Sequence, residues 1–128
     1  MNYIAHKDGD RRQTIKEHLE GTASLAQSFA EKFGKGEWGY CCGMLHDIGK
    51  YSEEFQQKIS NDTDKLVDHS TAGAQLCDKK GGYYSVLRYC IAGHHSGIPD
   101  GGTTNDYETD PTLTGRLKRE FEDFSRYK

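Results

Sequence analysis

The sequence predicts an all-α helical bundle, on three observations. Apolar residues recur at intervals of three and four along several segments, which is the period of a helix with one buried face. Helix-capping signals stand at the start of these segments, such as the Ser/Thr-x-x-Glu capping box of Thr14 and Glu17. The alternation of apolar and polar residues that is typical of strands is nearly absent.

The first expected helix follows this capping box and ends at Gly34. His18 borders its apolar face, whose residues are three or four positions apart. The residues of that face are Ile15, Leu19, Thr22, Ala26, Phe29 and Phe33.

The remaining helices are expected from the same period and from their end signals. They cover approximately residues 37–47, 52–59, 69–81 and 83–94, with a last helix after Asp110 and Pro111. We expect Cys77 and Cys90 to lie in the core, because both fall on apolar helix faces. The last helix has an apolar face made of Leu113, Leu117, Phe121 and Phe124.

Five of the six histidines and one aspartate form a candidate metal site between these helices. Each lies in or at the end of an expected helix, and inward-facing His and Asp side chains can hold a divalent metal in a bundle core. A carboxylate directly after a histidine can bridge two metals, so the series suggests a dinuclear, hydrolytic centre. The candidate ligands are His18, His46, Asp47, His69, His94 and His95.

The donor types indicate which metals are expected. The cysteines at positions 41, 42, 77 and 90 contain no C-x-x-C pair, which argues against a structural zinc site. Imidazole and carboxylate suit Mn, Fe, Co, Ni or Zn, whereas Mg²⁺ prefers shells made of oxygen. We therefore expect one or two divalent transition-metal ions.

Composition excludes several classes of protein. A chain of 128 residues is one domain or less, and its net charge of −3 gives no bulk attraction for nucleic acid. The first residues contain no apolar signal region, and no apolar run approaches the length of a membrane span. The unpatterned cysteines suit a reducing compartment, so we expect a cytoplasmic protein without a membrane segment. His6, in a polar stretch before the first helix, is expected to face solvent.

Two sequence strings carry a resemblance to a known family. The string H-D-I-G-K at 46–50 is followed by F-Q at 55–56, and G-H-H-S-G-I-P stands at 93–99. Together with His18 and His69, these strings resemble the HD-domain superfamily of metal-dependent phosphohydrolases. Within it, the chain is most similar to the HD nuclease domain of the CRISPR-associated type I helicase-nuclease.

The resemblance implies an HD-type helical fold and metal-dependent cleavage of single-stranded DNA in CRISPR antiviral defence. It also implies a helicase on the same or a partner chain, and a CRISPR interference complex as partner. Asp47 and Lys50 would be catalytic, with Lys50 near the scissile phosphate. By the same resemblance His18, His46 and Asp47 would hold one metal, and Asp47 would bridge to a second metal held by His69, His94 and His95.

The chain departs from the family's pattern in one respect. The family's series closes with a further aspartate on a later helix, and none of Asp100, Asp106, Asp110 and Asp123 stands in that context. We therefore expect residues 1–128 to form the N-terminal part of a larger HD domain. An apolar face left uncovered on the last helix would favour self-association.

Two other functions stay open from the sequence. The chain could be an HD phosphohydrolase that acts on nucleotides or cyclic dinucleotides. It could also be an interaction module that a metal stabilises and that catalyses nothing.

Overall fold

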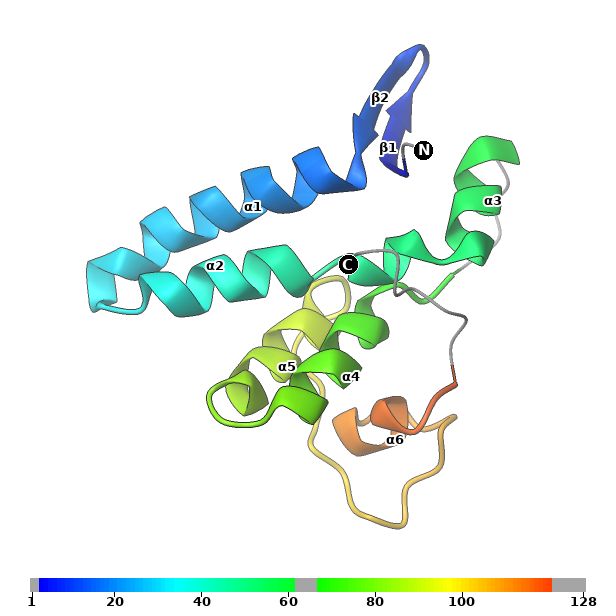
Figure 1. Ribbon diagram of the computed structural model, residues 1–128. Helices are drawn as coiled ribbons and strands as arrows, with labels where there is room; N and C mark the ends of the chain where they lie inside the picture. The colour runs from blue at the N-terminus through cyan, green and yellow to red at the C-terminus, as the bar shows by residue number, and fades with distance from the viewer. Residues whose placement is uncertain (1–2, 62–66, 121–128) are drawn as a thin grey trace.

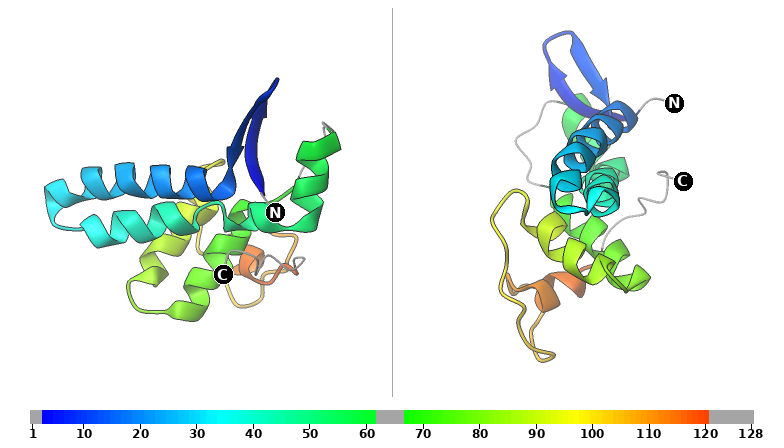
Figure 2. Two further views of the ribbon diagram at one scale, coloured as in Figure 1. Left: turned by 45° about the horizontal axis from the view of Figure 1, so that its top comes forward. Right: turned by 90° about the vertical axis from the view of Figure 1, so that its left-hand side faces the viewer.

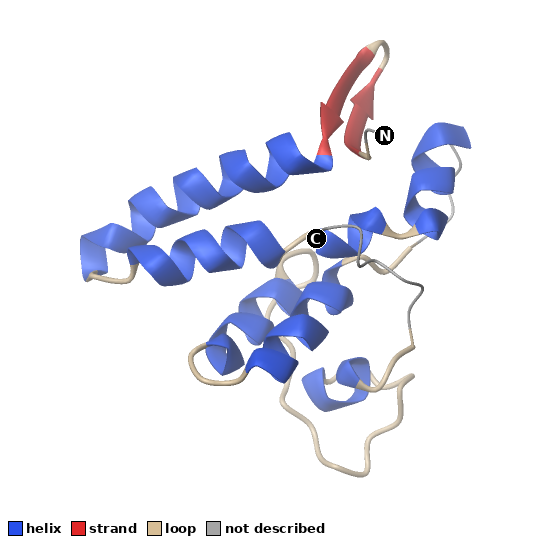
Figure 3. Ribbon diagram, viewed as in Figure 1, coloured by secondary structure: helices blue, strands red, loops and turns tan. Residues whose placement is uncertain are grey.

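The computed structural model describes residues 3–61 and 67–120, and within them the chain is predominantly helical (Figures 1 and 3). The prediction of an all-α bundle is confirmed. The elements are β1 (Ile4–Asp8), β2 (Arg11–Thr14), α1 (Ile15–Ala30), η1 (Glu31–Phe33), α2 (Gly36–Leu45), η2 (Ile48–Tyr51), α3 (Glu53–Asn61), α4 (Ser70–Lys80), α5 (Tyr84–Gly93) and α6 (Leu113–Leu117).

Helix α1 begins at the predicted capping box. The Glu17 amide donates to the Thr14 hydroxyl at 3.1 Å, and the Thr14 amide donates to the Glu17 carboxylate at 3.0 Å. The helix continues into η1, and Gly34 ends it with a φ of 76°, in the left-handed region where glycine has no steric penalty. The chain then turns back into α2, which lies beside α1 in every view (Figures 1 and 2).

Helices α1 and α2 pack through small residues rather than large ones. A Cβ atom at Gly43 would lie 2.4 Å from the Cα of Ala23, so the two backbones approach too closely for any side chain there. This contact leaves no room for rings between the helices. The prediction that Phe29 and Phe33 are buried is therefore wrong, and these side chains are 61 % and 69 % exposed.

Helices α4 and α5 form a second pair, which supplies most of the larger hydrophobic cluster. Cys77 is fully buried there as predicted, whereas Cys90 is exposed. The buried face of α5 is narrower than expected, because Leu87 and Ile91 point inward while Cys90 is turned to solvent. The core residues of this cluster are Ala74, Cys77, Leu87, Ile91, Ala92 and Leu113.

Strands β1 and β2 form a hairpin at the start of α1 that no sequence pattern predicts (Figure 3). Strand β2 reads Arg-Arg-Gln-Thr and has no apolar alternation, so nothing local marks it as a strand. Its pairing with β1 and the turn at Gly9, which has a φ of 60°, provide the order instead. The buried Ala5 attaches the hairpin to the core.

The last described helix, α6, is short and begins two residues later than predicted. Its N-cap is Thr112, whose hydroxyl accepts from the Gly115 amide, whereas Asp110 accepts from the Tyr107 amide in the preceding turn. The expected apolar positions Phe121 and Phe124 lie outside the described residues. Of the helices in the described ranges, none is long and apolar enough to cross a membrane.

Candidate metal centre

The predicted ligands come from separate elements, and five of the six stand at or near a helix end. His18 lies one turn into α1, and His46 and Asp47 occupy the turn between α2 and η2. His69 is the residue before α4. The pair His94–His95 follows α5 directly. The structure brings all six side chains to one place.

Asp47 lies at the centre, and its two carboxylate oxygens face different histidines. On one side, Oδ2 lies 2.7 Å from Nε2 of His18 and 3.1 Å from Nε2 of His46. On the other side, Oδ1 lies 3.0 Å from Nε2 of His94 and 3.4 Å from Nε2 of His69. The Asp47 side chain is only 4 % exposed, so its position is fixed by its surroundings.

The ligand atoms therefore form two sets that share Asp47. Within each set, all the potential ligand atoms lie within 4.8 Å of one another. The first set, on the Oδ2 side, is His18, His46 and Asp47. The second set, on the Oδ1 side, is Asp47, His69, His94 and His95.

Backbone carbonyls orient the imidazole rings from behind. Nδ1 of His46 donates to the carbonyl of Gly43 at 2.6 Å, and Nδ1 of His94 donates to the carbonyl of Ile91 at the same distance. A proton held on Nδ1 leaves Nε2 as the ligand atom, which is the usual arrangement behind metal-bound histidines. In both rings Nε2 points toward Asp47.

The electrostatics of the centre favour a cation. Burial by itself raises the pKa of Asp47, but hydrogen bonds with His18, His46 and His94 outweigh it and hold that pKa well below its usual range. Burial also lowers the pKa of His69 to about 4, so this ring is neutral near neutral pH and has a lone pair to offer. An ionised carboxylate among converging imidazole lone pairs fits a divalent transition metal.

The main chain itself connects the two sets. A Cβ atom at Gly49 would lie 2.4 Å from the carbonyl oxygen of His69 and 2.9 Å from its Cα. The glycine of the H-D-I-G-K string thus lets the backbone before α4 rest directly on the turn that carries Asp47. This contact places the His69 ring on the Oδ1 side.

Lys50 lies beside Asp47 and is almost completely buried. Its ammonium group donates to the carbonyl of Ala5 at 3.3 Å and lies 3.4 Å from Oδ2 of Asp47. Gln56 holds the backbone here, because its amide donates to the carbonyls of Lys50 and Ile4. Lys50 therefore contacts the first set, and its expected role near a scissile phosphate stays a prediction.

Arg116 joins the two helix ends that carry the second set, and the sequence did not single it out. Its guanidinium donates to the Thr71 and Ser70 hydroxyls at the start of α4, at 2.8–3.0 Å. It also donates to the carbonyl of Ala92 at the end of α5, at 2.6 Å. Its partners are 24 to 46 residues away, so no local pattern could have shown this role.

Two further residues near the centre make contacts that the sequence does not predict. His6 is exposed as expected, but its ring stacks edge-on against His18 with a centroid distance of 4.7 Å. Asp68 accepts from the Thr71 amide at 3.1 Å and pairs with Arg119 at 2.7 Å, which fixes the chain just before His69.

None of the later aspartates in the described ranges joins either set. Asp106 accepts from Thr103 and Thr112, and Asp110 caps a turn. Asp100 lies in the loop after α5 and is exposed. Asp123 lies outside the described residues.

The model of the HD domain family matches residues 15–123, a range that includes every candidate ligand. No curated protein matches the chain.

Proposed function

Since this chain belongs to the HD domain family, whose members are metal-dependent phosphohydrolases, we propose that it is a two-metal phosphodiesterase that cleaves single-stranded DNA. The observation that carries the proposal is the division of the Asp47 carboxylate. Each of its oxygens faces its own group of imidazoles, as a bridging ligand requires.

The residues of the chain have distinct roles in this proposal. Two divalent ions, when bound, polarise a phosphate and lower the pKa of a bound water. Asp47 would stay ionised and would be the residue shared by both positions. Lys50 lies against the same carboxylate oxygen as His18, and its charge stabilises the ionised form of Asp47. His94 and His95 are the most exposed members, so the Oδ1 side is where a substrate enters.

The choice of single-stranded DNA rests on the sequence resemblance. The H-D-I-G-K and G-H-H-S-G-I-P strings contain four of the six candidate ligands, and they resemble the HD nuclease domain of the CRISPR-associated type I helicase-nuclease. The chain would act with a helicase on the same or a partner chain, within a CRISPR interference complex. The helicase would supply the single strand.

A substrate panel tests the proposal. We expect the chain with added Mn²⁺ to cut circular single-stranded DNA, because a circle reports internal cleavage only, and to be inactive after chelation. A matched variant, Asp10→Asn, changes an exposed carboxylate in the hairpin turn and should be fully active.

The other outcomes identify the two alternatives. Phosphate released from a mononucleotide, or hydrolysis of a cyclic dinucleotide, with intact DNA would identify a nucleotide phosphohydrolase. Metal-dependent melting without cleavage of any phosphoester would identify a non-catalytic module.

A further inference from the structure

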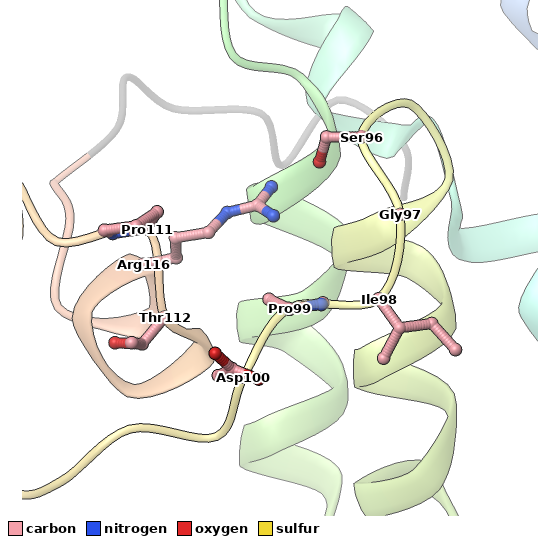
Figure 4. A pocket seen from close by; sticks show the side chains of 8 residues that line it. All are labelled: Ser96, Gly97, Ile98, Pro99, Asp100, Pro111, Thr112 and Arg116. Carbon is pink, nitrogen blue, oxygen red and sulfur yellow. The ribbon is translucent and has the colours of Figure 1, made fainter.

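A cavity begins at the residue that follows His95. It lies between the loop 96–100 and the start of α6, and its volume is about 340 Å³ (Figure 4). This volume is at the small end of the range for ligand pockets, which is about 300–1,000 Å³. Because Ser96 is bonded to His95, one wall of the cavity adjoins the second set of metal ligands.

Two exposed polar side chains in the cavity wall have no partner among the residues that the structure describes. Neither the Ser96 hydroxyl nor the Asp100 carboxylate makes a hydrogen bond or ion pair with any described residue. Thr112, by contrast, is occupied, since it accepts from Gly115 and donates to Asp106. The cavity thus presents a hydroxyl at one end and a carboxylate at the other (Figure 4).

Rigid residues form the remaining wall. Pro99, Pro111 and Arg116 line it (Figure 4). Arg116 is held in place by hydrogen bonds to Thr71, Ser70 and Ala92. Proline rings are apolar and have few conformations to lose, so they suit the flat face of a nucleobase. The guanidinium lies toward the Ser96 end, where its positive charge favours a phosphate.

We propose that this cavity binds one nucleotide of the DNA strand, next to the scissile phosphate, and that Asp100 selects guanine. Guanine presents two adjacent N–H donors on its pairing edge, which match the two oxygens of a carboxylate. Thymine presents one N–H between two carbonyl oxygens, which the carboxylate repels. Adenine and cytosine each present one amino group, so their affinity for the carboxylate should lie between those of guanine and thymine. The strand assignment rests on the proposed function, whereas the base preference can be measured without cleavage.

Binding of mononucleotides to the metal-free chain tests the base preference. We expect dGMP to bind about tenfold more tightly than dTMP in EDTA, the order of discrimination that one bidentate base contact supplies. Asp100→Asn should abolish the difference, because an amide replaces one acceptor by a donor. The variant keeps the fold, since the structural contact of Asp100 is its backbone carbonyl, which accepts from Leu113. Asp10→Asn is the matched control and should keep the preference.

Cleavage of oligonucleotides tests whether the bound nucleotide belongs to the DNA strand that is cut. In a thymidine strand with a single guanine, and with Mn²⁺ added, cuts should concentrate beside that guanine in the wild type and spread evenly in Asp100→Asn. Equal binding of dGMP and dTMP, or a preference that survives Asp100→Asn, overturns the inference. If the chain prefers dGMP but cuts no DNA, the result supports guanine binding in the cavity and refutes the proposed nuclease activity.

Discussion

The two sides of Asp47 are built differently. On the Oδ2 side, His18 lies within α1 and His46 caps the end of α2, and the backbones of these two helices touch at Gly43. A regular helix places a side chain by its own geometry, so close packing of the two helices is enough to bring these rings together.

On the Oδ1 side, the ligands stand at helix ends, where the backbone no longer fixes direction by itself. His69 precedes α4, and His94 and His95 follow α5. Here two contacts replace helix packing. One is the set of hydrogen bonds from Arg116 to the ends of α4 and α5, and the other is the backbone contact at Gly49. The Oδ1 side is therefore held by contacts between separate elements, whereas the Oδ2 side is held mainly by the packing of one helix pair.

Substitution of Asp47 should have the largest effect on activity, because both sides of the centre share its carboxylate. Asp47→Asn keeps the size of the side chain but removes the charge that both sets share. We expect cleavage of circular single-stranded DNA to fall on the order of a thousandfold, with loss of both metal ions. Metal content by mass spectrometry gives the second readout. Cleavage at the wild-type rate would refute a bridging role for this residue.

Removal of the Arg116 side chain should weaken metal binding on the Oδ1 side alone. Arg116→Met leaves buried acceptors at both helix ends unpaired, and we expect a loss of about 3 kcal/mol in the free energy of unfolding. One of the two ions should bind more weakly in calorimetric titration with Mn²⁺. Arg88→Met, which breaks the more exposed pair with Asp78, should cost less than about 1 kcal/mol. Equal weakening of both ions would show that the two sides are not separate.

Substitution of Gly43, where α1 and α2 touch, should weaken metal binding on the Oδ2 side alone. Gly43→Ala introduces a Cβ atom against the backbone of Ala23 and moves α1 away from α2, at a cost of about 2 kcal/mol. The His18–His46 separation should grow and weaken the first ion. Gly21→Ala, on α1 where a Cβ meets nothing, should instead stabilise the chain by up to about 1 kcal/mol. Urea unfolding measures the stability of both variants. A Gly43→Ala variant as stable as the wild type would contradict the close contact between the helices.

The smallest effect is expected at Asp68, and it depends on pH. Burial raises the pKa of Asp68, but hydrogen bonds from Thr71 and Arg119 outweigh it and hold that pKa below its usual value. A carboxyl with a lowered pKa stabilises the folded chain above the ordinary value, and the stability is lost as pH falls through the folded value. Asp68→Asn should therefore cost about 1 kcal/mol at pH 7 and nothing in strong acid. A cost that is equal at pH 7 and pH 2 would contradict this role.

Much of the Oδ2 side could be predicted from the sequence. The capping box of Thr14 and the period of α1 place His18 correctly, because both are local signals. The exposure of Phe29 and Phe33 could not be predicted, since the partner face on α2 is made of glycines, which carry no hydrophobic period.

The Oδ1 side was predictable only in its ligands. His69, His94 and His95 follow from helix boundaries and from the spacing of the strings. Their support does not, because Arg116 acts through residues far away in the sequence and looks like any polar residue of a short helix. The hairpin of β1 and β2 was missed for a similar reason, since its order comes from pairing rather than from pattern.

The wide spacing of the ligands ties the amount of folded protein to the metal supply. Residues from His18 to His95 meet only in the folded chain, so metal binds this form in preference to the unfolded one. A ligand at one hundred times its dissociation constant adds about 2.7 kcal/mol to the free energy of unfolding. The melting temperature should rise with added metal and fall with a chelator. In a cell short of metal, a larger share of the chain would unfold and meet proteases.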